Sequence, residues 1–242
     1  MTSATMTNDM RGKRPLIVFD VNETLLDLDS VTPVFERIFC DRFAMRLWFA
    51  DLILYSEALT LADAYVPFTD IGVAVMQMLA NTRGIDVTDG DKRDLTEAFA
   101  SMPPYPDVPA GLSRLRDAGF RLFTLTDNLL EIQTHQLEGG NIAHHFEQRL
   151  SVDVVKRHKP SPEAYAYVES QLGVEPSELL LIACHAWDVL GAVAAGWRGA
   201  LIKRPGNDVL AVGPQPEIVG MNLVDVADQL IARWASQPQR SM

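Results

Sequence analysis

A short apolar segment that ends in an aspartate constrains this sequence more than any other feature. Residues Leu16 to Phe19 are all apolar, Asp20 follows them directly, and Thr24 comes four positions later. A buried strand of an open parallel sheet ends at the edge where ligands bind. A carboxylate at that edge is placed as a nucleophile, and Asn22, two positions on, bears on the leaving group that the site accepts. We therefore expect the chemistry of this chain to centre on Asp20.

Beyond this strand the sequence divides into a helical block and an alternating block. Apolar residues recur at spacings of three and four from about Val31 to Ala100, which is typical of helices. Four prolines between Ser101 and Pro109 then interrupt helix formation. From Gly111 onward, predicted strands and helices alternate, which favours a parallel sheet with right-handed crossovers.

The alternating block is predicted to hold strands over residues 120–125, 150–155, 179–183 and 200–203, and helices over residues 111–118, 131–138, 162–172, 188–195 and 223–234. The predicted fold class is therefore α/β. Residues 14–29 and 103–242 are expected to form a parallel-sheet core, and residues 30–102 an all-helical cap over the ligand-binding edge. Residues 1–13 are predicted to be a disordered leader.

Composition excludes several classes of protein. The formal net charge is −11, so nucleic acid is not an expected partner. The two cysteines, Cys40 and Cys184, lie far apart, which favours a reduced cytoplasmic setting. The N-terminus lacks the apolar segment of a signal peptide, and the apolar stretch from Leu179 to Trp197 is interpreted as a strand and a helix, not a membrane span.

Residues able to do chemistry follow each predicted strand. A single aspartate at a strand end is more often a helix cap than a nucleophile. Several groups of polar residues, each at the end of a predicted strand or in a nearby loop, are a more specific sign of an active site. Besides Asp20, Asn22 and Thr24, they are Thr126, Asp127 and Asn128 after the second strand, Lys159 before the helix at 162–172, and Cys184, His185, Trp187 and Asp188 after the strand at 179–183.

In this arrangement, Asp20-x-Asn22-x-Thr24, the apolar run into Thr126, Lys159-Pro160 and Ala186-Trp187-Asp188 resemble the haloacid dehalogenase superfamily, and in particular its 2-haloacid dehalogenase branch. The similarity extends from about residue 16 to about residue 214. The resemblance implies a Rossmann-like core with an inserted helical cap. It also implies a hydrolase that acts on carbon–halide bonds of a small-molecule substrate.

The resemblance assigns roles to individual residues. Asp20 is the nucleophile, Lys159 keeps it ionised, and the Thr126 hydroxyl holds one of its oxygens. Asp188 serves the second step, by orienting Lys159, positioning a water or binding a metal, and Thr24 ties the loop after Asp20. The residues predicted to contact substrate are Val21, Asn22, Phe49, Asp127, Asn128, His185 and Trp187.

Two reactions compete. Superfamily phosphatases carry an aspartate two residues after the nucleophile as a general acid, whereas this chain has Asn22, which suits a halide that leaves without protonation. Cys184, four positions before Asp188, is also a poor Mg²⁺ ligand. We expect no cofactor and no metal. The alternative is a phosphatase with Mg²⁺ at Asp20 and Asp188, and a binding protein without activity on the same fold stays open.

Substrate recognition departs from the dehalogenase branch at two positions. There an arginine follows a tryptophan in the early cap, whereas here Trp48 is followed by Phe49, and Arg42 and Arg46 are the nearest arginines. Asp127 stands where that branch has an asparagine, and its charge would repel a halide. The sequence does not identify the natural substrate. A homodimer is a possible assembly, because symmetric dimers are the commonest oligomers of soluble proteins.

Overall fold

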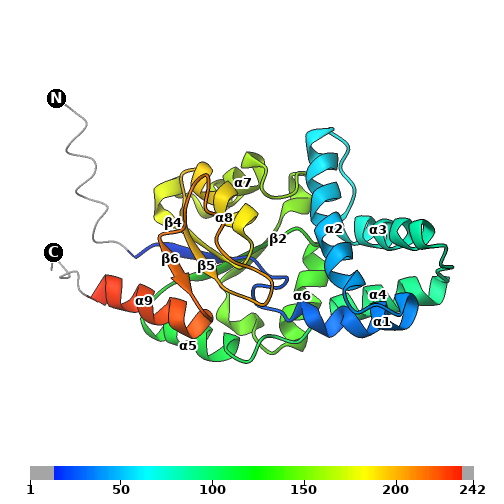
Figure 1. Ribbon diagram of the computed structural model, residues 1–242. Coiled ribbons are helices and arrows are strands. Elements are labelled where there is room, and N and C mark those ends of the chain that lie inside the picture. Colours follow the sequence, from blue (N-terminus) through cyan, green and yellow to red (C-terminus); the bar gives the residue numbers. More distant parts are fainter. Residues whose placement is uncertain (1–13, 236–242) are drawn as a thin grey trace.

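The computed structural model describes residues 14–235, so the predicted leader over residues 1–13 lies outside the described part (Figure 1). Within this described part, six parallel strands form one sheet with the order β3-β2-β1-β4-β5-β6. The strands are β1 (Leu16–Phe19), β2 (Leu122–Thr126), β3 (Gln148–Ser151), β4 (Leu179–Ala183), β5 (Arg198–Ile202) and β6 (Ile218–Gly220).

Strand β1 lies in the middle of the sheet. Phe19 pairs with Thr124 of β2 on one side and with Ile182 of β4 on the other. All residues of these three strands are buried, as expected for a parallel sheet covered on both faces. Because the strands are parallel, the residues that follow them meet at one edge.

Helices cover both faces of the sheet. Buried apolar residues of α5 (Val108–Asp117) and α9 (Leu223–Ala235) pack with Ile17, Phe19 and Ile182 on one face. Residues of α7 (Pro162–Leu172) and α8 (Ala186–Ala194) pack with Val18 and Leu181 on the other. Helix α6 (Leu130–Gly139) follows β2 and packs beside β3. This is the predicted α/β class.

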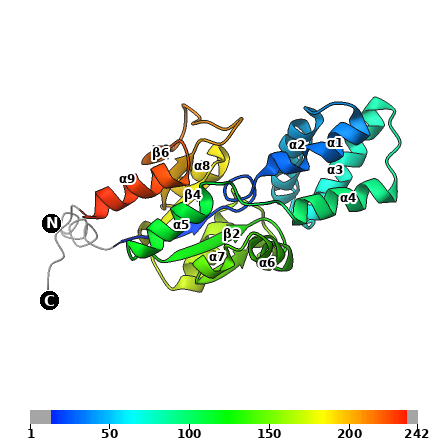
Figure 2. The same cartoon turned by 90° about the horizontal axis from the view of Figure 1, so that it is seen from below.

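The cap consists of α1 (Thr32–Phe39), α2 (Ala44–Leu61), α3 (Phe68–Arg83) and α4 (Asp89–Ala100), which stand apart from the sheet in Figure 2. Gly84, with φ +65°, ends α3, and Thr88 caps α4 together with Asp91. The prediction of an inserted all-helical cap is confirmed.

The chain enters and leaves the cap through two paired segments. Asp27 N donates to Pro103 O at 2.8 Å, and Tyr105 N donates to Leu25 O at 2.9 Å. An antiparallel bridge joins Leu26 to Pro104 between these two bonds. The two linkers therefore run side by side at the boundary between sheet and cap.

Some predicted boundaries were wrong. The strand expected over residues 150–155 lies at 148–151, because the Ser151 hydroxyl accepts a hydrogen bond from Asp153 N and turns the chain into a 3₁₀ helix over Val152–Val154. Strand β6 was not predicted, since its three residues follow Pro214 and Pro216. Helix α8 begins at Ala186, so Asp188 lies in its first turn.

Within residues 14–235 no helix is long and apolar enough to cross a membrane.

Candidate active site

Asp20 lies at the centre of the sheet edge, directly after β1. It is 5% exposed, and its neighbours come from the ends of β2 and β4 and from the loop before α7. The predicted catalytic residues Asp20, Thr24, Thr126, Lys159 and Asp188 are all buried at this edge. The sheet topology therefore brings together residues that are up to 168 positions apart in the sequence (Asp20 to Asp188).

The Lys159 ammonium joins two carboxylates. Its Nζ lies 2.8 Å from Asp20 Oδ1 and 2.7 Å from Asp188 Oδ2. Burial by itself would raise the pKa of Asp20, but Lys159 and His185 hold it below its ordinary value. Burial would likewise lower the pKa of Lys159, whereas Asp188 and Asp20 raise it. Asp20 is therefore ionised and Lys159 protonated near neutral pH.

Tyr165 fixes the second oxygen of Asp188. Its hydroxyl donates to Asp188 Oδ1 at 2.8 Å, and it also lies 3.0 Å from the Asp188 backbone oxygen. Burial raises the pKa of Asp188, and the nearby Asp20 charge adds to this shift against the effect of Lys159. Both carboxylate oxygens of Asp188 are thus engaged by protein groups.

Thr24, and not Thr126, is the threonine that contacts the carboxylate of Asp20. Thr24 Oγ1, not Thr126, donates to Asp20 Oδ2, at 2.6 Å, and it accepts a hydrogen bond from Cys184 N at 2.9 Å. Thr126 Oγ1 instead accepts from Asn128 N at 3.2 Å. The position four residues after a strand-end aspartate can return to the carboxylate because a tight turn closes the loop, with Leu25 N donating to Val21 O.

Asp127 is turned towards the loop that carries Lys159. Its Oδ1 accepts from Lys159 N at 2.9 Å and lies 3.3 Å from His158 Nδ1, while its Oδ2 is 3.8 Å from Lys159 Nζ. The carboxylate therefore serves to position Lys159. Its expected repulsion of a halide is reduced because these groups face its charge.

The two predicted amides, Asn22 and Asn128, contact each other. Asn22 Oδ1 accepts from Asn128 Nδ2 at 3.4 Å and from Gln136 Nε2 at 3.3 Å. All three side chains are buried. Asn22 is therefore held as an acceptor in an amide cluster.

His185 connects the nucleophile to a second carboxylate that sequence reasoning did not single out. His185 Nε2 lies 2.9 Å from Glu23 Oε2, and Nδ1 lies 3.3 Å from Asp20 Oδ2. Glu23 also pairs with Arg46, whose other guanidinium nitrogen lies 2.7 Å from Asp29 Oδ1. Arg46 is thus committed to acidic partners and Arg42 is exposed, so neither stands in for the arginine of the dehalogenase branch.

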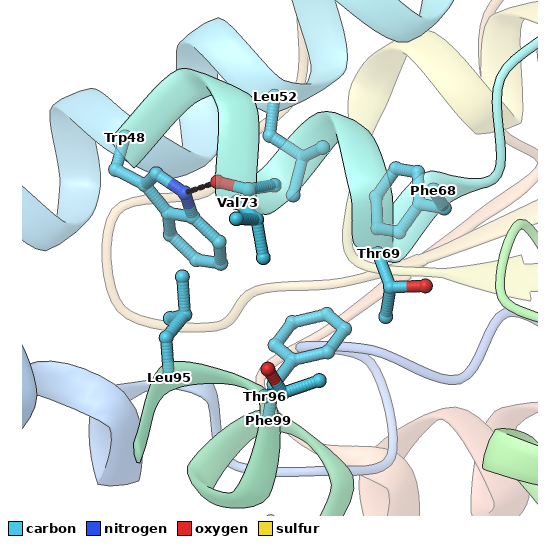
Figure 3. A pocket seen from close by; sticks show the side chains of 9 residues that line it. Trp48, Leu52, Phe68, Thr69, Val73, Leu95, Thr96 and Phe99 are labelled. Atoms are coloured by element: carbon cyan, nitrogen blue, oxygen red, sulfur yellow. Dashed lines mark hydrogen bonds between the residues drawn. The ribbon is translucent and has the colours of Figure 1, made fainter. Parts of the chain in front are cut away.

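Phe49 lies at the boundary between the cap and Asp20. Trp48 is anchored inside the cap, where its Nε1 donates to Gly72 O at 2.7 Å among Leu52, Phe68 and Phe99 (Figure 3). The small cavity beside it has a volume of about 10 Å³, which is room for about one water and no substrate. The next residue, Phe49, places its ring centroid 5.7 Å from that of His185.

The other two predicted substrate contacts lie close by. Val21 is fully buried, and its carbonyl accepts from Leu25 N and Leu26 N, so it shapes the loop more than it presents a side chain. The Trp187 ring stacks on His185 with a centroid distance of 5.1 Å and lies 5.7 Å from Lys159 Nζ.

Two sets of residues in the described part of the chain contain the types of side chain that bind metals. Between Asp20 and Asp188, the Lys159 ammonium already supplies a positive charge to one oxygen of each carboxylate. The donor atoms of Glu23, Cys184 and His185 lie within 4.8 Å of one another, a set of types that bind Zn²⁺. There the Arg46 guanidinium already neutralises Glu23, and burial raises the pKa of the Cys184 thiol. Neither set fits a cation.

Sequence reasoning missed Glu23 and Tyr165 as site residues. Glu23 sits in a loop, where a charged residue is normally interpreted as exposed, and no spacing signals its burial. Tyr165 lies in the first turn of α7, three positions after Pro162, and an aromatic residue there is ordinarily interpreted as core.

A buried aspartate lies at the end of β1, with a lysine and a second aspartate beside it. This fold and site are those of a class of hydrolases, and comparison of the chain with known protein families identifies the class. Residues 15–196 match the haloacid dehalogenase-like hydrolase family, and the chain belongs to it.

Among its relatives, (S)-2-haloacid dehalogenase 1 of Pseudomonas sp. (strain CBS-3) is 30% identical over 189 residues, which cover 77% of this chain and 83% of that protein. Haloacetate dehalogenase H-2 of Moraxella sp. (strain B) is 28% identical over 218 residues, covering 89% and 97%. A dehalogenase crystallised with an intermediate complex superposes with a TM-score of 0.84 at 26% identity, covering 91% of this chain and 98% of that one.

Proposed function

We propose that this protein hydrolyses the carbon–halogen bond of 2-haloacids through an aspartyl ester of Asp20. The observation that carries this proposal is the bridge from Lys159 Nζ to Asp20 and Asp188, together with the hydroxyl of Tyr165 on the remaining Asp188 oxygen. These contacts keep the nucleophile ionised, and the Lys159 ammonium supplies the positive charge between the two carboxylates. The family and the named relatives support the same reaction.

The reaction needs two displacements. A carboxylate oxygen of Asp20 attacks the carbon that bears the halogen, and the bonding electrons leave with the halide, inverting that carbon. Water then adds to Cγ of the ester, the bond from Cγ to the attacking oxygen breaks, and a 2-hydroxy acid and one proton are released. The product hydroxyl is therefore the oxygen that Asp20 supplied.

The surrounding residues have separable roles in this proposal. Lys159 stabilises the carboxylate before attack, and Asp188 accepts the proton of the hydrolytic water, a task that its raised pKa favours. Thr24 and Thr126 hold the strand ends that carry the chemistry. The residues proposed to line the substrate are Val21, Asn22, Phe49, Asn128, His185 and Trp187, with Asp127 positioning Lys159.

The same proposal divides the chain by task. Within the described part of the chain, residues 14–29 and 103–235 form the catalytic core, and residues 30–102 form the cap that supplies Phe49. Residues 236–242, which the sequence assigned to the core, lie outside the described residues. A groove of about 580 Å³ lies at their junction, lined by Thr60 and Leu61 of the cap and by His158 and Pro160 of the core, and we assign it as the approach to Lys159. No cofactor is required, and cytoplasmic location and a homodimer stay predictions.

Halide release from chloroacetate, fluoroacetate and 2-chloropropionate, measured with and without EDTA, tests the function. We expect release that EDTA does not change and that the Asp20→Asn variant lacks. A phosphate-ester panel with Mg²⁺ is the comparison. Release of phosphate but of no halide would overturn the proposal in favour of a phosphatase.

A further inference from the structure

A buried carboxylate and a buried imidazole stand beside the nucleophile, and neither has a role in the hydrolysis of the ester as described above. Glu23 is 1% exposed and His185 is 4% exposed. His185 Nε2 is anchored on Glu23 at 2.9 Å, whereas Nδ1 lies 3.3 Å from Asp20 Oδ2 without a well-aligned hydrogen bond. Nε2 is thus fixed by Glu23, whereas Nδ1 faces the carboxylate of Asp20 and can still donate a hydrogen bond.

The backbone of Glu23 is held in an unfavourable conformation. Its φ is +60°, in the left-handed region that side chains other than glycine seldom adopt. Its carboxylate is held on one side by His185 and on the other by Arg46 of the cap helix α2. A strained residue that keeps a buried charge next to a nucleophile is a feature that clusters at functional sites.

The two oxygens of Asp20 are in different environments. Oδ2 receives the Thr24 hydroxyl at 2.6 Å, and that hydroxyl is oriented because Cys184 N donates to its oxygen. His185 Nδ1 also approaches Oδ2, whereas Oδ1 has Lys159 Nζ as its contact, at 2.8 Å. Oδ1 therefore keeps a lone pair free for attack, and Oδ2 becomes the carbonyl oxygen of the ester.

We propose that the Nδ1–H of His185 donates a hydrogen bond to Asp20 Oδ2 when water adds to the ester, and that Glu23 is the positioning residue that keeps His185 doubly protonated. This inference rests on the proposed dehalogenase function. Water addition turns Cγ tetrahedral and places negative charge on Oδ2. The charge returns to re-form the C=O bond as the bond from Cγ to Oδ1 breaks. Oδ1 leaves in the alcohol product, which takes the proton that Asp188 accepted from the water, and the second water proton is released as the Asp20 carboxylate re-forms.

The position of His185 Nδ1 suits the tetrahedral intermediate more than the ground-state carboxylate of Asp20. A donor for an oxyanion is matched to the position that the oxygen takes in the tetrahedral intermediate, outside the plane of the original carboxylate. Contacts of this kind are often long and poorly aligned before substrate binds. The 3.3 Å separation at His185 Nδ1 has this character, whereas the 2.6 Å bond from Thr24 is already formed.

The charged groups around His185 agree with a cationic ring. Asp20 and Glu23 face it from the loop after β1, and the Cys184 thiol faces it from the end of β4, while α2 and α8 present the uncharged rings of Phe49 and Trp187. Burial alone would lower the pKa of His185, but Cys184, Asp20 and Glu23 raise it well above its ordinary value. As an imidazolium, His185 is a hydrogen-bond donor and not the base for water.

The ionisation is tested without substrate by NMR titration of isotope-labelled histidines, with the His185 signal assigned from its absence in His185→Gln. We expect a doubly protonated ring at neutral pH in the wild type and a lower pKa in Glu23→Gln and Glu23→Gly. The glycine variant suits the φ of +60° and guards against misfolding. A wild-type ring that is neutral at pH 7 overturns the inference.

The catalytic role is tested by single turnover with 2-chloropropionate, following halide release and the mass of the intact protein. In His185→Gln we expect the Asp20 ester to accumulate, because hydrolysis slows about 100- to 1,000-fold and halide release slows much less. In Glu23→Gln the decline of hydrolysis with rising pH should shift to lower pH. His135→Gln and Glu36→Gln, both at exposed positions, are the matched controls.

The outcomes separate the two proposals. Slower halide release in His185→Gln without ester accumulation overturns the role in hydrolysis, as does hydrolysis that increases as His185 loses its proton. A wild-type protein that forms no ester with any haloacid overturns the proposed function and the catalytic half of this inference with it. The NMR titration still decides whether the pair is ionised.

Discussion

Gly191 and Tyr165 are so close that no side chain fits between them. A Cβ at Gly191 would lie 2.5 Å from Tyr165 Oη and 2.5 Å from Cβ of Pro160. Tyr165 in turn holds Asp188, and Pro160 follows Lys159 directly. The absence of a side chain at Gly191 of α8 therefore allows Tyr165 and Pro160 to take up positions that support Asp188 and Lys159 beside the nucleophile.

Gly191→Ala should impair both stability and catalysis. Overpacking should lower the free energy of unfolding by about 1–3 kcal/mol, and displacement of Tyr165 should slow hydrolysis of the ester. Urea unfolding and single-turnover kinetics measure the two effects. Gly139→Ala is the matched control, because nothing lies within 4 Å of its Cβ position. Equal behaviour of the two variants would contradict this account of the packing.

Asp20→Asn should abolish halide release while the protein stays folded. An amide is no nucleophile for the carbon–halogen bond, and its size is that of the carboxylate it replaces. Removal of one charge leaves Lys159 paired with Asp188 at 2.7 Å. Ion chromatography for halide and circular dichroism for folding make the comparison, and halide release from the purified variant would remove Asp20 from the mechanism.

Phe49→Arg should improve turnover of short 2-haloacids. Phe49 is 6% exposed and faces His185 beside Asp20, so a guanidinium there would meet the substrate carboxylate in a weakly hydrated site. We expect KM to fall about tenfold, which corresponds to about 1.4 kcal/mol of binding. Phe49→Leu controls for the loss of the ring. A KM that stays the same or increases in Phe49→Arg would mean that this position does not face the carboxylate.

The stability supplied by His185 should depend on pH with a definite sign. Its pKa in the folded protein is raised above the value of about 6.5 in an unfolded chain. Its contribution is therefore fully present below about pH 6.5 and is lost as the pH rises through the folded pKa.

Urea unfolding of the wild type and of His185→Gln, compared at about pH 6 and about pH 9, measures this difference. The two proteins should differ more at the lower pH, and His135→Gln should match the wild type at both. A gap that widens towards alkaline pH would assign the opposite sign to the pKa shift.

The fold was largely predictable because its signals are local. The apolar run ending at Asp20, the helical spacing from residue 31 to residue 100 and the prolines before α5 each report on their own neighbourhood. Strand β6 escaped prediction because three residues after two prolines carry too little pattern, and its place is fixed by pairing with β5. A short edge strand of this kind is stabilised by pairing with a neighbouring strand, and that pairing is not apparent from its own three residues.

The candidate site was predictable in its composition but less so in its connections. Asp20, Lys159 and Asp188 could be placed together because parallel strands end at one edge. That Thr24, not Thr126, reaches Asp20, and that Glu23 turns inward to meet His185 and Arg46, depends on loop conformations. No regular spacing encodes such loops, and a positive φ at a glutamate is not a sequence signal.

The paired linkers at Leu25–Asp27 and Pro103–Tyr105 have an evolutionary consequence. Because the chain leaves and returns at the same place, hydrogen-bonded to itself, everything between these points can be exchanged without redirecting the strand that carries Asp20. Residues such as Phe49 can therefore diverge with the cap while the nucleophile and its lysine stay unchanged. Lineages with this architecture are free to acquire new substrates by altering one module and to inherit the chemistry intact from the other.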